Sequence, residues 1–112
     1  MLLKDRRLEA QIMLVRIGNS KDVAAGQMRS FDVAGTKVNV VNANGHLYGL
    51  DDTCTHMGCS LASGKLDGTT VTCPCHGSQF DVTSGAVLRG PARRPVRSRL
   101  LQVNNGDLLA ET

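Results

Sequence analysis

The sequence predicts an all-β protein: an antiparallel sandwich or partly open barrel, with a smaller subdomain inserted into it. Three observations support this fold class. Short apolar segments with strand-like alternation follow one another from residue 12 onwards, separated by turn-forming residues. Asn44-Gly45 joins two such segments directly, which is a strong signal for an antiparallel hairpin. Residues 52–89 interrupt this rhythm, because they are rich in Cys, Gly, Ser and Thr.

The elements follow in order from these signals. Met13, Val15 and Ile17 alternate in a first strand that Gly18-Asn19-Ser20 ends, and residues 22–27 are expected to form a turn or one helical turn. The next strands are expected at residues 28–34, 37–43 and 46–50. Within the insertion we expect two short strands around a turn at residues 66–69, and a hairpin at residues 81–88. The last strands are expected at residues 96–103 and 108–110, around a turn at residues 104–106.

The chain has 112 residues, which favours a single domain over residues 12–112, with residues 1–11 as a charged N-terminal arm. No internal repeat is evident. The longest apolar run near the start is Ile12–Val15, far below the roughly 20 residues that span a bilayer. No export signal is recognisable at Arg6-Arg7. We therefore expect a soluble, cytoplasmic protein without a membrane span.

Two short stretches carry the chemistry: Cys54-Thr-His56-Met-Gly-Cys59 and Cys73-Pro-Cys75-His76-Gly-Ser78. Each places a cysteine near a histidine, and sixteen residues separate His56 from Cys73. Two thiolates and two imidazoles suit an iron–sulfur centre or structural zinc, although zinc sites usually contain C-x-x-C knuckles, which are missing here. A disulfide framework would leave the histidines unexplained, and a thiol nucleophile would lack an evident substrate pocket.

The two stretches, the second extended through Gln79-Phe80-Asp81, resemble the ligand boxes of the Rieske [2Fe–2S] proteins. Gly90-Pro91-Ala92 resembles the proline loop that covers one side of the cluster in this family, and the resemblance spans about residues 12–110. It implies one [2Fe–2S] cluster per chain, whose inner iron is held by Cys54 and Cys73 and whose outer iron is held by His56 and His76. It also implies a disulfide between Cys59 and Cys75.

The resemblance also suggests how the cluster is tuned. Two neutral imidazoles in place of two thiolates make the oxidised centre nearly neutral, which raises its reduction potential. Ser78 is expected to hydrogen-bond a sulfur, as in the high-potential members. Those members usually have Tyr where this chain has Phe80, which is expected to pack in the core. Rieske ferredoxins of dioxygenase systems usually lack the cysteine pair, whereas cytochrome bc-type Rieske proteins usually have it.

The family resemblance implies a one-electron carrier rather than an enzyme. We expect a soluble ferredoxin, a monomer or small complex subunit, that delivers electrons from a reductase to an oxygenase or other terminal acceptor. The alternatives are a Rieske or accessory subunit of a larger oxidoreductase, of nitrite-reductase or quinol-oxidising type, and a non-redox zinc-binding interaction module. Only His46 remains beyond the two ligand histidines, and it is expected on a strand face, so this chain cannot also hold the mononuclear iron of an oxygenase.

The basic residues are unevenly distributed, although the net charge is only +3. Five arginines fall within eleven positions: Arg89, Arg93, Arg94, Arg97 and Arg99. They indicate either a solvated basic loop and strand or a docking patch for a redox partner with an acidic surface. Nucleic acid is disfavoured, because no aromatic residue is interleaved with these arginines to stack on bases.

Overall fold

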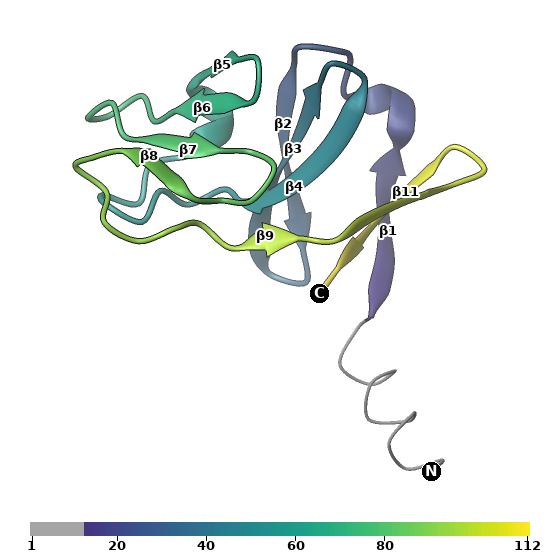
Figure 1. Cartoon of the computed structure of the whole chain (residues 1–112). Helices are drawn as coiled ribbons and strands as arrows, with labels where there is room; N and C mark the ends of the chain where they lie inside the picture. The colour runs from purple at the N-terminus through teal and green to yellow at the C-terminus, as the bar shows by residue number, and fades with distance from the viewer. Residues whose placement is uncertain (1–12) are drawn as a thin grey trace, which may run out of the picture.

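The computed structural model describes residues 13–112, so the expected N-terminal arm at residues 1–11 lies outside the described residues. Eleven strands and two 3₁₀ helices form this part of the chain (Figure 1). The strands are β1 (Leu14–Asn19), β2 (Met28–Val33), β3 (Thr36–Ala43), β4 (His46–Asp51), β5 (Lys65–Asp67), β6 (Thr70–Thr72), β7 (Gln79–Asp81), β8 (Val87–Arg89), β9 (Ser98–Arg99), β10 (Leu101–Asn104) and β11 (Asp107–Glu111). The helices are η1 (Ser20–Asp22) and η2 (Leu61–Ser63).

The strands form three antiparallel sheets, which confirms the predicted fold class. The sheet orders are β1-β11-β10, β2-β3-β4-β9 and β5-β6-β7-β8. The third sheet uses only residues from the interrupted segment, and Figure 1 shows it beside the hairpins of β2, β3 and β4. The helix η2 contacts β2 and β3, so it connects the inserted sheet to the rest of the molecule. None of the described helices has the length and apolar character needed to cross a membrane.

The turn between β3 and β4 has the geometry that its sequence predicts. Asn44 and Gly45 have φ values of 57° and 89°, and Ala43 pairs with His46 across the turn. Both central residues therefore have positive φ, as a two-residue hairpin turn of this kind requires. Glycine adopts that conformation without strain, and asparagine tolerates it better than most residues.

A turn forms at residues 25–26, within the expected residues 22–27. A short helical turn, η1, leads into it and ends at Asp22; Asn19 and Asp22 cap it reciprocally, because Asn19 Oδ1 accepts from the N–H of Lys21 and Asp22 Oδ2 accepts from the N–H of Asn19. One local expectation needs correction: the strand expected at residues 96–103 is two strands in different sheets. Strand β9 pairs with β4 at Gly49 and Leu50, and after Leu100 the chain joins β11 as β10.

The core extends from the main sheets into the inserted segment. Along β3, Val38 and Val40 pack with residues of the β1-β11-β10 sheet, whereas Val41 and Ala43 belong to a cluster that also contains Phe80. The same cluster includes two cysteines, Cys54 and Cys73, together with other buried residues of the insertion: Leu61, Val71, Val82, Ala92 and Val96. Hydrophobic burial therefore fixes the positions of these two thiols.

Candidate metal centre

Two loops carry the Cys and His residues, and they share one backbone pattern. We define ligand loop 1 as residues 53–60 and ligand loop 2 as residues 72–79. In loop 1 the N–H of Cys54 donates to the carbonyl of Cys59 (2.9 Å), and the N–H of Gly58 donates to the carbonyl of Cys54 (2.9 Å). In loop 2 the equivalent bonds join Cys73 to Ser78 (2.8 Å) and Gly77 to Cys73 (3.2 Å).

The glycines and the loop bases repeat as well. Gly58 and Gly77 each lie four residues after the cysteine, with φ of 77° and 81°, a conformation that glycine adopts readily. Each loop rests on an antiparallel pair, Thr53 with Ser60 and Thr72 with Gln79. This repeat was not expected from the sequence. The shared pattern Thr-Cys-x-x-x-Gly at residues 53–58 and 72–77 is the signal that indicates it.

The two thiols lie on the inner side of the loops. Cys54 and Cys73 are free cysteines with exposed fractions of only 2% and 3%. Burial raises the pKa of the Cys73 thiol, and the neighbouring side chain of Cys54 adds to this increase. Hydrogen bonds from the backbone N–H groups of Cys75 and His76 act in the opposite direction, because they favour the thiolate. The pocket is therefore equipped to stabilise a sulfur anion once a cation replaces the proton.

The two imidazoles lie on the outer side. His56 and His76 are exposed, and their ring centroids are 5.2 Å apart with the rings nearly perpendicular, at 86°. The two loops therefore supply two buried sulfur donors and two exposed nitrogen donors. The donor set therefore fits a mixed Cys₂His₂ iron–sulfur cluster.

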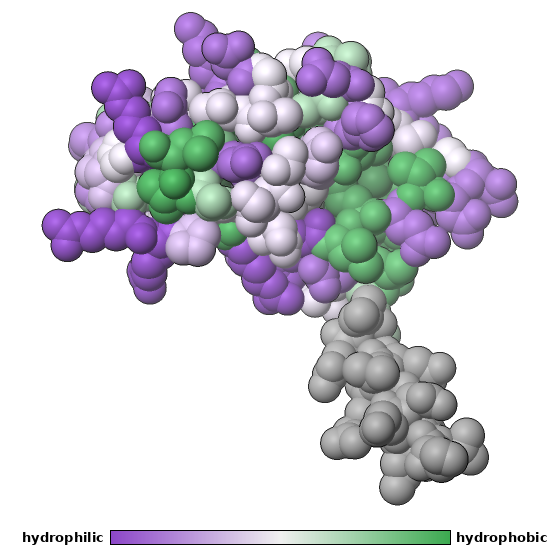
Figure 2. Space-filling model, in the orientation of Figure 1, coloured by the Kyte–Doolittle hydropathy of each residue, from purple (hydrophilic) through white to green (hydrophobic). Residues whose placement is uncertain are grey.

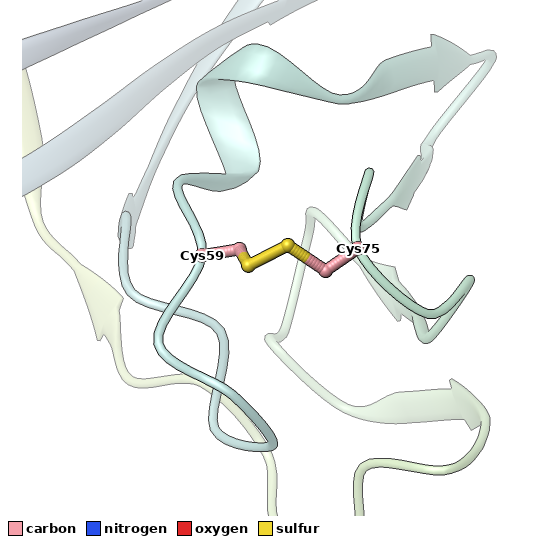
Figure 3. The surroundings of a disulfide bond; sticks show 2 residues. All are labelled: Cys59 and Cys75. Atoms are coloured by element: carbon pink, nitrogen blue, oxygen red, sulfur yellow. A yellow bond between two sulfur atoms is a disulfide. The ribbon is translucent and has the colours of Figure 1, made fainter.

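A disulfide joins the two loops between Cys59 and Cys75 (Figure 3). This is the pair that the family resemblance implies. The sulfur atoms of Cys59, Cys73 and Cys75 all lie within 4.8 Å of one another, so the bridge is in close proximity to one of the free thiols. Because the bridged sulfurs are not available as thiolates, only Cys54 and Cys73 remain as thiolate donors.

The residues expected around the cluster occupy different environments. Ser78 is fully buried, and its Oγ accepts a hydrogen bond from the N–H of Ala92 (2.9 Å), which leaves its own O–H free to donate elsewhere. Phe80 is fully buried in the core. Gly90 and Pro91 are exposed, and Pro91 lines a surface hollow together with His56.

Sequence analysis did not identify two further residues that support ligand loop 1. The carboxylate of buried Asp52 accepts from the hydroxyl of Ser60 (2.5 Å) and the N–H of Ala62 (2.8 Å), which closes the base of the loop. The hydroxyl of Thr55 donates to the carbonyl of Arg94 (2.7 Å). For Asp52 the sequence offers one signal, an acidic residue two positions before Cys54. Thr55 offers none, because its partner is remote in sequence.

His46 does not belong to the centre. It lies exposed at the start of β4, as expected for a residue beside the hairpin turn, and its ring centroid is 6.5 Å from that of Tyr48.

Comparisons with known proteins agree with the donor set. The sequence profile of the Rieske [2Fe-2S] domain matches residues 13–100. The ferredoxin component of biphenyl 2,3-dioxygenase from Rhodococcus jostii (strain RHA1) is 31% identical over 98 residues, which cover 88% of this chain and 92% of that protein. The chloroplastic cytochrome b6-f complex iron-sulfur subunit of Bigelowiella natans is 42% identical over 77 residues, which cover 62% of this chain and 28% of that protein.

A similar fold occurs in the solved complex of reduced oxygenase and oxidized ferredoxin in carbazole 1,9a-dioxygenase. The matched chain has a TM-score of 0.83 and 28% sequence identity, and the match covers 88% of this chain and 92% of the other. The profile match and the similarity along almost the whole ferredoxin component identify the cofactor as a [2Fe–2S] cluster and the role as electron transfer. The chain belongs to the Rieske [2Fe–2S] family and is similar to the ferredoxin components of dioxygenase systems.

Proposed function

We propose that this protein is a cytoplasmic one-electron carrier that accepts electrons from a reductase and delivers them to a terminal oxygenase. The observation that carries the proposal is that two matching loops hold a pair of buried, free thiols and a pair of exposed, adjacent histidines. The relatives support this assignment, because one is a ferredoxin component and another occurs in a complex with an oxygenase. The sequence contains three histidines, and two of them are assigned to the cluster. The remaining one, His46, is too few for the mononuclear iron of an oxygenase, so that iron belongs to the partner.

In this proposal Cys54 and Cys73 hold the inner iron, and His56 and His76 hold the outer iron. The bound cluster supplies a couple that takes up and releases one electron. The N–H groups that point at the sulfur of Cys73 favour the reduced, more negative state and therefore raise the potential. The exposed edges of the two imidazoles provide the shortest route to a docked partner.

Ligand variants test the assignment. His76→Ala and Cys73→Ser are expected to abolish the visible absorption and the electron paramagnetic resonance signal of the reduced Rieske cluster, because each removes a ligand. His46→Ala is the matched control and should retain both signals together with full iron and acid-labile sulfide content. Retention of an unchanged resonance signal by His76→Ala, or its loss in His46→Ala, would contradict the ligand set.

A second candidate function is that of a subunit in a quinol-oxidising complex. The disulfide between Cys59 and Cys75 and the similarity to a cytochrome b6-f subunit favour it. The reduction potential distinguishes the two, because Rieske centres span about −150 to +300 mV. A value near the lower limit supports the ferredoxin role, whereas a value near the upper limit, with co-purification of a larger complex, supports the alternative.

A further inference from the structure

A shallow hollow lies next to one of the two exposed histidines. It has a volume of about 400 Å³ and is lined by Thr55, His56, Pro91, Arg93 and Arg94. Its walls therefore come from ligand loop 1 and from the arginine-rich segment, which we define as residues 89–97. Met57, with an exposed fraction of 59%, follows His56 in the chain and adds an apolar group to this part of the surface.

The arginine-rich segment is held against both ligand loops. The N–H of Ala92 donates to Ser78 Oγ (2.9 Å) in loop 2, and the carbonyl of Arg94 accepts from Thr55 Oγ1 (2.7 Å) in loop 1. Further along the segment, the N–H of Val96 donates to the carbonyl of Gly85 (2.9 Å). These bonds fix the backbone of the arginine-rich segment, so the Cα atoms of its arginines have defined positions around the hollow.

Four of the five clustered arginines carry uncompensated charge. Arg99 is almost buried and pairs with Asp51 (2.6 Å), whereas no ion pair in residues 13–112 involves the exposed arginines of the segment: Arg89, Arg93, Arg94 and Arg97. Acidic groups are few here. Between residues 52 and 97 they are Asp52, which is buried, Asp67, and Asp81, which bonds to Thr83. Figure 2 shows hydrophilic side chains projecting from the end of the molecule that carries β5–β8.

We propose that this hollow is the docking site for an acidic protein surface, whose carboxylates pair with Arg93 and Arg94 and seat the partner on the His56 side of the histidine pair. The inference deepens the proposed electron-carrier function and rests on it. Complementary charge increases the rate of encounter more than it adds affinity, and salt screens it. The partner is a protein rather than a nucleic acid, because the segment has no aromatic side chain for base stacking.

The test compares Arg93→Gln/Arg94→Gln with Lys21→Gln/Lys37→Gln, which removes two exposed charges from η1 and β3. Binding of a fluorescent oligoglutamate peptide to the cluster-loaded protein is measured by anisotropy. The arginine variant should bind about fivefold more weakly or worse, as expected for two exposed ion pairs, and the lysine variant should bind as the wild type does. Equal binding by both variants, or binding that is insensitive to salt, would overturn the proposal.

A kinetic measurement tests whether Arg93 and Arg94 also control the access of small charged oxidants to the cluster. The reduced protein passes one electron to cobalt(III)–EDTA, an anion, or to cobalt(III) tris-bipyridine, a cation, and each becomes cobalt(II). The arginine variant should react more slowly with the anion and faster with the cation, and the control should change neither rate. If the rates with both oxidants change in the same direction, the result contradicts an electrostatic role for the two arginines. If the wild-type protein shows an intact resonance spectrum but the arginine variant shows no selectivity between the two oxidants, the docking proposal fails and the electron-carrier function stands. If the wild-type protein shows no cluster signal, the electron-carrier function fails.

Discussion

The two ligand loops use one backbone turn for different purposes. Position by position, His56 in loop 1 corresponds to Cys75 in loop 2, and Cys59 in loop 1 corresponds to Ser78 in loop 2. The disulfide therefore joins positions that are not equivalent, and it leaves Ser78 to bond the segment after β8. The repeated hydrogen bonds fix the shape of each loop, while the side chains at its variable positions decide which part of the site it supplies.

The bases of the loops also differ in charge. Loop 1 closes on the carboxylate of Asp52, which accepts from Ser60 and Ala62 and has no cationic partner among the described residues. Loop 2 closes on a neutral bond in which Gln79 Nε2 donates to Thr72 Oγ1 (3.2 Å). A negative charge beside one loop disfavours addition of an electron to a centre between them. We therefore expect loop 1 to lower the reduction potential relative to a symmetric arrangement.

Removal of the disulfide between the two loops should have the largest effect on stability and on cluster retention. In Cys59→Ser/Cys75→Ser the two loops are no longer linked, and a cross-link that closes a loop of this size, with a sequence separation of 16, contributes about 3 kcal/mol to the free energy of unfolding. Denaturant titration should show that loss, and the visible absorption should bleach faster on heating. Chemical reduction of the wild-type bridge should reproduce both changes. Unaltered bleaching in both preparations would contradict a mechanical role for the bridge.

Ser78→Ala should have the next largest effect. The substitution leaves the buried N–H of Ala92 without its acceptor, which costs about 1–3 kcal/mol of stability. The potential should fall as well if the Ser78 hydroxyl donates to a sulfur. Ser60→Ala in loop 1 is the matched comparison: it should cost less, because Ser60 is only half-buried and Asp52 keeps its bond from Ala62. Equal losses of unfolding free energy in the two variants would remove the distinction between the loops.

Asp52→Asn tests the electrostatic difference. Asparagine retains an oxygen for the N–H of Ala62 but carries no charge, so the reduction potential should rise. The expected size is on the order of 1 kcal/mol at an effective dielectric constant near 20, or roughly 40 mV for one electron. Asp67→Asn, at the exposed end of β5, is the control and should shift the potential much less. Protein-film voltammetry measures both, and equal shifts would assign the effect to overall net charge.

Local sequence signals predicted most of the strands but not how they are divided among the sheets. The Asn44-Gly45 turn located β3 and β4, because two residues with positive φ determine a hairpin without help from the rest of the chain. The change of sheet at Leu100 was missed, because alternation identifies a strand and not its neighbour. What separates β9 from β10 is packing with partners remote in sequence: Leu101 packs beside the Val40 and Leu108 cluster.

The candidate site, like the fold, could be predicted only where its signals are local in the sequence. The spacing of Cys54, His56, Cys73 and His76 indicated a donor set, because ligand spacing is local to each loop. The bonds that hold these loops in place join residues far apart in the sequence: Thr55 and Arg94 are 39 positions apart, and Ser78 and Ala92 are 14 apart. Such contacts become visible only when the fold brings the arginine-rich segment back to the loops.

The smallest expected effect concerns the strand that leaves ligand loop 2. Asp81 in β7 accepts hydrogen bonds from the hydroxyl (2.7 Å) and the N–H (2.9 Å) of Thr83, and these bonds lower the pKa of Asp81 below its ordinary value of 3.8. A lowered pKa in the folded state contributes stability at neutral pH, and the contribution disappears as the pH falls through the folded pKa.

Thr83→Val, which keeps the N–H and loses the hydroxyl, should therefore be slightly less stable than the wild type at neutral pH. The difference should shrink as the pH falls below about 4, whereas Thr83→Ser should match the wild type throughout. Denaturation midpoints measured across that range test the sign, and a difference that stays constant with pH would show that the hydroxyl acts through packing rather than through the charge of Asp81.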